Sequence, residues 1–184
     1  MVSGTGPAEL LGEYRARGAA EAADVERARG LLGSGVDAWD RGTPLHFTAS
    51  ALIVHPESGR VLLRWHVRQQ AWLHVGGHGD PGETEALAVG LREGLEETGL
   101  TDLAPWPDAA LVHVAVVPVP ASTREPAHEH ADLRFLLATA TPEAVRPENP
   151  QSPLEWLTVA QARERTTEAN FRETIDRAGR LLGA

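Results

Sequence analysis

The chain contains no cysteine, and this absence removes three kinds of site at once. Without a thiol there is no disulfide framework, no thiolate metal site and no cysteine nucleophile. The sequence also lacks any run of about 18 apolar residues, so it predicts no membrane-spanning helix. Its first ten residues, MVSGTGPAEL, have neither the basic flank nor the apolar stretch of a secretory signal. We therefore expect a cytoplasmic protein.

Positive charge is scarce as well. The 184 residues include 17 Lys and Arg against 26 Asp and Glu, which gives a formal net charge of −9. A chain with this balance does not hold nucleic acid by broad charge attraction, so we expect no nucleic-acid partner. It can still bind a phosphorylated small molecule if a bound cation mediates the contact. The length indicates one domain with a sizeable core.

The apolar pattern predicts an α/β protein with a short helical arm in front. Residues 7–32 favour helix with a weak middle at Gly18, and residues 33–44 read as a linker. We expect strands, including a hairpin over 46–67, at residues 46–55, 60–67, 71–75, 110–120, 131–140 and 154–159. Helices are expected at residues 84–98 and 159–182. The arm can dock on the domain or pair two subunits, so a homodimer remains open.

The helix over 84–98 concentrates negative charge on one side. Thr84 is the expected N-cap and Gly99 the expected C-terminal stop. At about 100° per residue, one side carries Leu87, Leu91, Gly94, Leu95 and Thr98. The opposite side carries Glu93, Glu96 and Glu97, together with Ala86 and Val89.

Like charges three and four residues apart destabilise a helix. A solvated acidic face leaves that cost unexplained, and Arg92 is the only cation on the helix. Carboxylate and carbonyl oxygens are the ligands that Mg²⁺ prefers, commonly together with substrate phosphates. The pattern therefore favours a metal-binding face.

The stretch GGHGDPGETEALAVGLREGLEETGL (Gly76–Leu100) resembles the Nudix box, G-x5-E-x7-R-E-U-x-E-E-x-G-U, in which U is bulky and apolar. The residues that match by type are Gly77, Glu83, Arg92, Glu93, Glu96, Glu97, Gly99 and Leu100. The resemblance implies an α/β/α sandwich with a mixed sheet over residues 46–184, after an arm and linker at 1–45. It also implies hydrolysis of a diphosphate linked to another moiety, with bound Mg²⁺ or Mn²⁺.

The same resemblance implies roles for individual residues. Glu93, Glu96 and Glu97 would be metal ligands, and the Gly76 carbonyl would complete the metal shell. Glu93 or Glu97 would also act in catalysis, together with Glu83. Arg92 would orient the glutamates by charge-assisted hydrogen bonds.

The stretch departs from the Nudix box at three places. Eight residues instead of seven separate Glu83 from Arg92, which puts the role of Glu83 in question. Gly94 stands where a bulky residue is expected, and a close contact between helix and sheet is the favoured reason. Val75 replaces the proline that often precedes the two glycines.

Several residues outside the box are candidates for the site. On an extended strand, His128, His130, Asp132 and Arg134 share one side, and Glu129, Ala131, Leu133 and Phe135 share the other. His74 and His78 flank the double glycine. The histidines can extend the metal site, bind phosphate when protonated, or make ordinary hydrogen bonds. Glu129 and Asp132 are candidates for an extra metal ligand.

Trp72, just before the box, can stack a nucleobase or simply pack. The candidate substrate-binding residues are Trp72, His78, His128 and His130.

The sequence is compatible with three functions to different degrees. The leading one is a metal-dependent pyrophosphohydrolase acting on a small-molecule diphosphate. The alternative is a regulatory protein on the same fold that binds a nucleotide or diphosphate without cleaving it. An isomerase of isoprenyl diphosphates is disfavoured, because that chemistry resembles a cysteine-dependent protonation and this chain has no cysteine.

Overall fold

The computed structural model describes residues 6–123 and 125–184. Two helices, α1 (Pro7–Glu13) and α2 (Ala19–Leu32), come before the sheet. The break between them falls where the sequence predicts it, because Gly18 has a φ of 108° that L side chains rarely adopt. In the described part of the chain, no helix is long and apolar enough to cross a membrane.

Eight strands of the described residues form one mixed sheet. They are β1 (Leu45–His55), β2 (Arg60–His66), β3 (Ala71–Leu73), β4 (Val75–Gly77), β5 (Ala104–Pro105), β6 (His113–Val119), β7 (His128–Ala138) and β8 (Leu154–Thr158). The order is β3-β2-β1-β7-β5, with β4 also paired to β1, β6 to β7 and β8 to β2. The β1–β7 pair is parallel and the other pairs are antiparallel. The predicted hairpin is confirmed as β1 and β2, joined by the short helix η1 (Pro56–Ser58).

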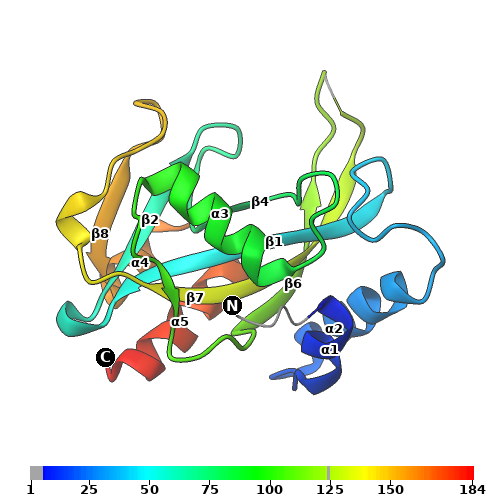
Figure 1. Ribbon diagram of the computed structural model, residues 1–184, viewed down its shortest axis with the longest axis horizontal. Helices are drawn as coiled ribbons and strands as arrows, with labels where there is room; N and C mark the ends of the chain where they lie inside the picture. Colours follow the sequence, from blue (N-terminus) through cyan, green and yellow to red (C-terminus); the bar gives the residue numbers. More distant parts are fainter. Residues whose placement is uncertain (1–5, 124) are drawn as a thin grey trace.

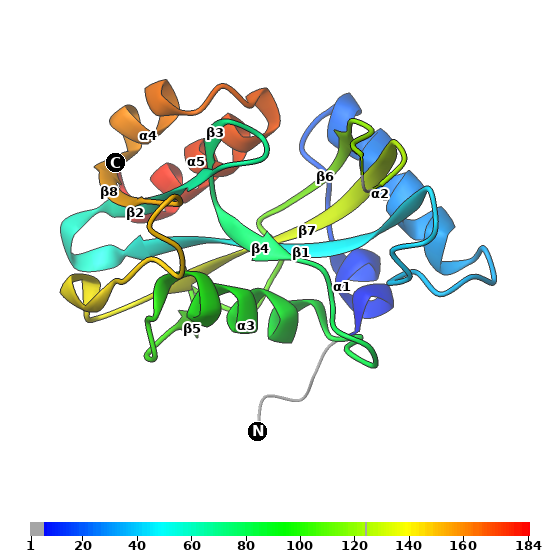
Figure 2. The ribbon, with the colours of Figure 1, turned by 90° about the horizontal axis from the view of Figure 1, so that it is seen from above.

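Helices cover both faces of the sheet. Figure 2 shows α3 (Ala86–Thr98) below it, with α4 (Val159–Arg165) and α5 (Ala169–Leu182) above it. A second short helix, η2 (Pro142–Ala144), precedes β8. The architecture is the α/β/α sandwich expected from the sequence, with the helical arm at one end beside β6 (Figure 1).

The two faces of β1 explain how one strand serves both layers. Its odd-numbered residues from Phe47 to Ile53 belong to apolar clusters shared with α3. On the opposite face, Leu52 and Val54 pack in the cluster that holds α4 and α5. The same face carries polar residues in the first half of the strand. Side chains alternate along a strand, so all even-numbered residues of β1 lie on this face. The face is therefore polar in the first half of β1 and apolar in the second half.

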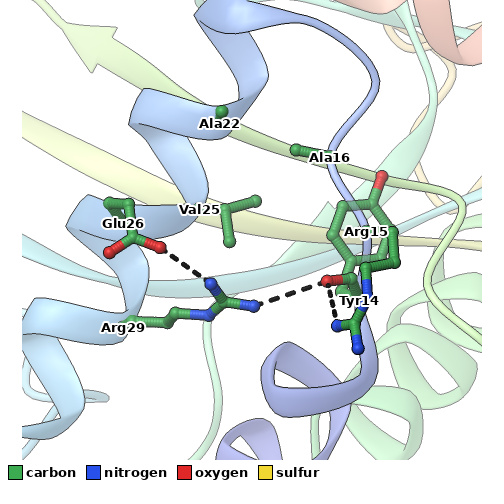
Figure 3. Close-up of a pocket in the computed structure, with 7 residues that line it drawn as sticks. All are labelled: Tyr14, Arg15, Ala16, Ala22, Val25, Glu26 and Arg29. Atoms are coloured by element: carbon green, nitrogen blue, oxygen red, sulfur yellow. Dashed lines mark hydrogen bonds and ion pairs between the residues drawn. The ribbon is translucent and has the colours of Figure 1, made fainter.

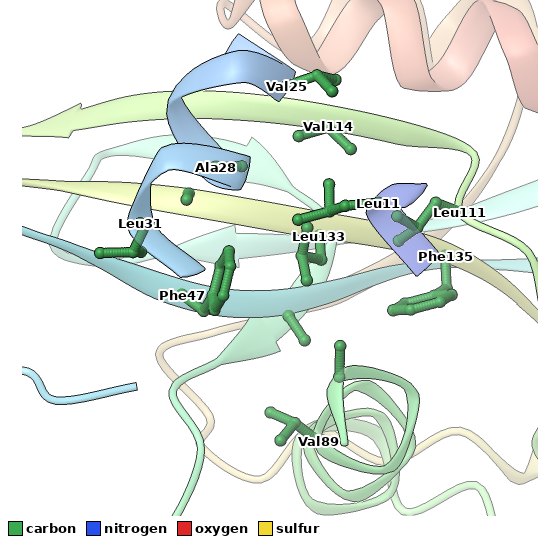
Figure 4. Packing of buried hydrophobic residues seen from close by; sticks show 13 residues of the cluster. Leu11, Val25, Ala28, Leu31, Phe47, Val89, Leu111, Val114, Leu133 and Phe135 are labelled. Atoms are coloured by element: carbon green, nitrogen blue, oxygen red, sulfur yellow. The ribbon is translucent and has the colours of Figure 1, made fainter. Parts of the chain in front are cut away.

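The helical arm docks on the domain. Leu11, Val25, Ala28 and Leu31 are buried in one cluster with Phe47 of β1 (Figure 4). The apolar side of the arm is therefore covered within the chain.

A buried ion pair ties the arm to the last helix. Glu21 of α2 and Arg177 of α5 lie 2.7 Å apart, with side chains that are 5% and 1% exposed.

Several boundaries differ from the sequence-based expectation. The strand expected at 71–75 is two strands, β3 and β4, strand β5 was not expected, and β6 begins at His113 instead of residue 110. Helix α3 begins at Ala86 with Glu85 as N-cap, and no side chain caps it, so Thr84 lies in the loop. The expected C-terminal helix is two helices, because Thr166 ends α4 in an extended conformation. Strand β7 begins at His128, three residues earlier than expected, because it pairs with both β1 and β6 there.

Candidate active site

The double glycine allows strand β4 to approach its neighbours closely. Gly76 pairs with Ser50 of β1 and has a φ of 146°. A Cβ on Gly76 would lie 2.5 Å from the Ser50 Oγ. A Cβ on Gly77 would lie 2.6 Å from Oε1 of Glu93. The fold requires glycine at Gly76, because of its positive φ and because a Cβ there would also lie 2.6 Å from the Ser50 Cα. At Gly77 a Cβ would displace the Glu93 carboxylate.

Helix α3 packs on the sheet through small residues. Its buried residues are Ala86, Val89, Gly90, Gly94 and Thr98. The expected division of the helix into an apolar and an acidic side was wrong at both ends: Leu95, grouped with the apolar residues, is 48% exposed, whereas Ala86 and Val89, grouped with the glutamates, are buried. A Cβ on Gly94 would lie 2.9 Å from Cδ1 of Leu103, in the loop before β5, and 3.5 Å from Cδ1 of Leu137 of β7. The tightest contact at Gly94 is therefore with that loop, and its contact with the sheet is an ordinary one. The close approach selects small side chains and leaves the larger Leu95 outside.

Glu93 and Glu97 lie toward the packed side of α3, with side chains that are only 16% and 12% exposed. Burial raises the pKa of Glu93 above its ordinary value. It raises the pKa of Glu97 to about 7, although Arg64 beside it acts in the opposite direction. Both carboxylates therefore lack the solvation that would favour their charged forms.

Arg92 forms ion pairs with three carboxylates of the box. Its guanidinium lies 3.0 Å from Glu83, 3.1 Å from Glu93 and 2.9 Å from Glu96. It also donates to the carbonyl oxygen of His78 at 2.8 Å. Burial acts against the charge, but Glu83 and Glu93 raise the pKa of Arg92 above its ordinary value.

Glu83 also accepts the backbone N–H of Asp80 at 2.8 Å, so it ties Arg92 to the loop before α3. Glu83 therefore keeps its contact with Arg92 although one extra residue separates the two in the box.

Glu97 has a cationic partner from outside the helix. Arg64 of β2 lies 3.1 Å from it, and the Gly76 N–H donates to it at 3.2 Å. Arg92 is the only cation on the helix itself, and Arg64 adds a second cation from the sheet. The buried Nε of Arg64 has no hydrogen-bond partner within the described residues.

The donor set fits a hard divalent cation. Four carboxylates, from Glu83, Glu93, Glu96 and Glu97, face two guanidinium groups, so the site keeps a surplus of negative charge. All four supply oxygen, the ligand type that Mg²⁺ and Mn²⁺ prefer.

The two acidic candidates outside the box are engaged elsewhere. Glu129 pairs with Arg27 of α2 on the surface. Asp132 is buried, accepts from Ser50 at 2.7 Å and pairs with Arg134 at 2.7 Å. Burial would raise the pKa of Asp132, but Arg134 holds it below its ordinary value.

The faces of β7 are those expected from the sequence. Ala131, Leu133 and Phe135 lie in an apolar cluster. On the other face, the parallel register sets three polar residues of β7 beside three of β1. This polar row consists of the pairs His46 with His130, Thr48 with Asp132, and Ser50 with Arg134.

Three of the four candidate histidines come together, and His46 replaces the fourth. Each of His46, His78, His128 and His130 offers one ring nitrogen within 4.8 Å of the others. Burial lowers the pKa of His78 to about 3 and that of His130 to about 4. Those two rings are therefore neutral near pH 7, which disfavours phosphate binding by protonated histidine there.

The fourth candidate, His74, lies apart from that group. Its Nε2 is 3.6 Å from Asp132, and its ring meets the edge of Phe171. The only sequence signal for His46 was its place at the head of a strand with alternating polar residues.

Trp72 of β3 packs against Trp65, with ring centroids 5.8 Å apart. The guanidinium of Arg165 lies 5.2 Å from the centroid of the Trp72 ring. A cation–π contact thus already uses one face of this ring.

Two surface pockets lie outside the carboxylate cluster. One, of about 230 Å³, belongs to the arm, where Arg29 bonds to Glu26 and to the backbone of Tyr14 (Figure 3). The other, of about 540 Å³, lies between the linker, with Trp39 and Arg41, and the loop that carries Glu83. The second pocket therefore borders the box.

Comparison with solved structures shows similarity over most of the chain. A C. elegans Ap4A hydrolase in a binary complex has 20% identity and a TM-score of 0.59, covering 77% of this chain and 98% of that one. The E. coli dihydroneopterin triphosphate pyrophosphohydrolase has 18% identity and a TM-score of 0.56, covering 77% and 97%. A NUDIX-family hydrolase from Clostridium perfringens has 24% identity and a TM-score of 0.56, covering 75% and 96%. At these identities the likeness establishes a shared fold.

Comparison with curated proteins returned no match. The family model described as NUDIX domain matches residues 44–178, which include the whole sheet and every carboxylate of the box. The chain therefore belongs to the Nudix family.

Proposed function

We propose that this protein hydrolyses a diphosphate linkage in a small phosphorylated molecule, with a divalent cation held at the carboxylates of α3. The observation that carries the proposal is the surplus of negative charge at Glu83, Glu93, Glu96 and Glu97, two of which are largely buried. A solvated acidic face would not bury Glu93 and Glu97. The fold shared with a dihydroneopterin triphosphate pyrophosphohydrolase and an Ap4A hydrolase supports the same reaction class.

The proposed roles follow from the contacts. Glu93, Glu96 and Glu97, with the Gly76 carbonyl, hold Mg²⁺ or Mn²⁺, which neutralises phosphate charge and lowers the pKa of bound water when present. Arg92 orients Glu93 and Glu96, and Glu83 orients Arg92. One of the two largely buried carboxylates, Glu93 or Glu97, takes a proton from the attacking water. The water oxygen bonds to phosphorus as the bridging P–O bond breaks.

The test is release of phosphate products from a panel of diphosphates with Mg²⁺, with Mn²⁺ and with chelator. Because two of the similar structures are named for Ap4A and dihydroneopterin triphosphate, these compounds join sugar nucleotides in the panel. We expect cleavage of at least one compound that stops with chelator. In Glu97→Gln, kcat should fall by at least about 100-fold, or about 2.7 kcal/mol of barrier.

Glu57→Gln is the matched control, because the Glu57 side chain is 92% exposed and lies on η1. It should turn over at the wild-type rate. If Glu97→Gln also does so, the assigned metal site is wrong.

The alternative is a protein that binds a nucleotide or diphosphate without cleaving it. It would be favoured if the folded protein keeps such a ligand unchanged in Mg²⁺ across the whole panel. The cytoplasmic location and the homodimer remain predictions from the sequence.

A further inference from the structure

The four clustered histidines come from three separate parts of the sheet. His46 lies at the start of β1, His78 follows β4, and His128 and His130 lie at the start of β7. The parallel register places His46 directly beside His130. The His46 ring lies 5.1 to 5.3 Å from the other three rings, centroid to centroid. The His130 ring lies 4.7 to 5.1 Å from the other three, so His46 and His130 each contact the whole group. His46 is fully buried.

Backbone contacts fix two of these rings in a form that can bind a metal. Nδ1 of His46 lies 2.9 Å from the carbonyl oxygen of Thr43, and Nδ1 of His128 lies 2.9 Å from that of Pro126. A carbonyl oxygen only accepts, so each Nδ1 must donate its hydrogen. In a neutral ring the lone pair is then on Nε2. Such a bond on the far nitrogen is the usual support of a metal-bound histidine.

Both Nε2 atoms point at another ring of the group. Nε2 of His46 lies 3.1 Å from Nε2 of His78, and Nε2 of His128 lies 3.1 Å from Nε2 of His130. Four nitrogens around a tetrahedral Zn²⁺, each at about 2.0–2.1 Å, stand about 3.4 Å from one another. Two of the observed nitrogen–nitrogen separations, at 3.1 Å, are slightly shorter than this value, and all of them lie within 4.8 Å. Small movements of the rings would therefore reach the tetrahedral arrangement.

The ligand chemistry separates this group from the carboxylates of α3. Imidazole nitrogen suits Zn²⁺ and its neighbours in the first transition row, whereas carboxylate oxygen suits Mg²⁺ and Mn²⁺. A backbone contact connects the two groups, because the His78 carbonyl accepts a hydrogen bond from Arg92.

We propose that His46, His78, His128 and His130 form a second cation site, which binds one transition-metal ion of the Zn²⁺ class independently of the catalytic carboxylates. The bound metal ion would connect the start of β1, the start of β7 and the loop that leads into the box. It thereby fixes the His78 carbonyl that helps to hold Arg92.

The experiment is a titration of the chelator-treated full-length protein with Co²⁺, a spectroscopic substitute for Zn²⁺, followed by visible absorption. We expect d–d bands of tetrahedral intensity that saturate at one equivalent, and displacement of these bands by Zn²⁺. His128→Gln and His130→Gln should weaken Co²⁺ binding by at least about 100-fold, because even loss of a supporting contact costs 10–100-fold. Circular dichroism checks that both variants fold.

Two controls separate this site from other binding. His55→Gln changes a histidine outside the group, which bonds to Ser58, and should keep the full spectrum. Glu93→Gln removes a carboxylate of the catalytic site and should also keep it. The proposal is overturned if wild type gives no tetrahedral bands at one equivalent, if both histidine variants bind as wild type does, or if Glu93→Gln abolishes the bands.

Discussion

Replacing Arg177 by Met should destabilise the protein strongly, because it leaves a buried carboxylate without its cation. Arg177 donates to both carboxylate oxygens of Glu21, at 2.7 and 2.9 Å. It also donates at 2.8 Å to the Tyr14 hydroxyl and to the Val112 carbonyl. Removing one partner of a buried ion pair costs about 3–5 kcal/mol.

The acidity of Glu21 gives a second measure of the same interaction. Burial opposes the charge, but the hydrogen bonds from Arg177 and Tyr14 lower the pKa of Glu21 from 4.5 to about 2. At about 1.4 kcal/mol per pKa unit, this corresponds to roughly 3 kcal/mol at neutral pH. Because the pKa is lowered on folding, that stability is present above pH 4.5 and is lost as the pH falls toward 2.

The assay is urea unfolding at pH 7, followed by tryptophan fluorescence and circular dichroism. Arg180→Met is the matched control on the same helix, because its side chain is 56% exposed and its contact with Glu173 is 3.4 Å long. It should change the free energy of unfolding by less than about 0.5 kcal/mol. The double variant Glu21→Leu/Arg177→Met should recover most of the loss. An Arg177→Met protein within about 1 kcal/mol of wild type would refute the reasoning.

Two further predictions concern the box and acid stability. In Gly77→Ala, the new Cβ meets the movable carboxylate of Glu93 at 2.6 Å, so turnover should fall while thermal unfolding stays near wild type. Gly76→Ala meets the Ser50 backbone at 2.6 Å and should unfold at a clearly lower temperature, and equal melting of both variants would contradict this difference. Burial, with Arg134 nearby, lowers the pKa of His113 from 6.5 to about 3 in the folded protein. Below pH 6.5 the His113 ring is therefore protonated in the unfolded state but not in the folded state, so the free energy of unfolding decreases as the pH is lowered. Between pH 7 and 5, His113→Gln should lose about 2 kcal/mol less than wild type in urea unfolding, and parallel losses would count against a neutral buried ring.

The box could be predicted from the sequence because its contacts are local. Arg92 reaches Glu93 and Glu96 within one helical turn and Glu83 across a short loop. The hairpin and the alternation along β7 are likewise short-range patterns, and both are confirmed.

The rest depends on contacts between distant segments. Arg64 meets Glu97 because β2 lies near α3, and nothing in either segment alone indicates this. The packed side of α3 was misjudged at Leu95 because the close approach of helix to sheet favours small residues over large apolar ones. His46 joins His130 only through a parallel pairing of strands 84 residues apart.

That pairing has a consequence for the order in which the molecule assembles. The box is complete once residue 100 has been made, and its arginine contacts need nothing further along the chain. The polar row is different, because each of its pairs takes one member from β1 and the other from β7. Pairing of strands so distant closes a long loop and tends to form late. A slip of one residue would turn every polar side chain of β7 toward the apolar cluster. The polar row therefore forms only when β1 and β7 have paired in the correct register.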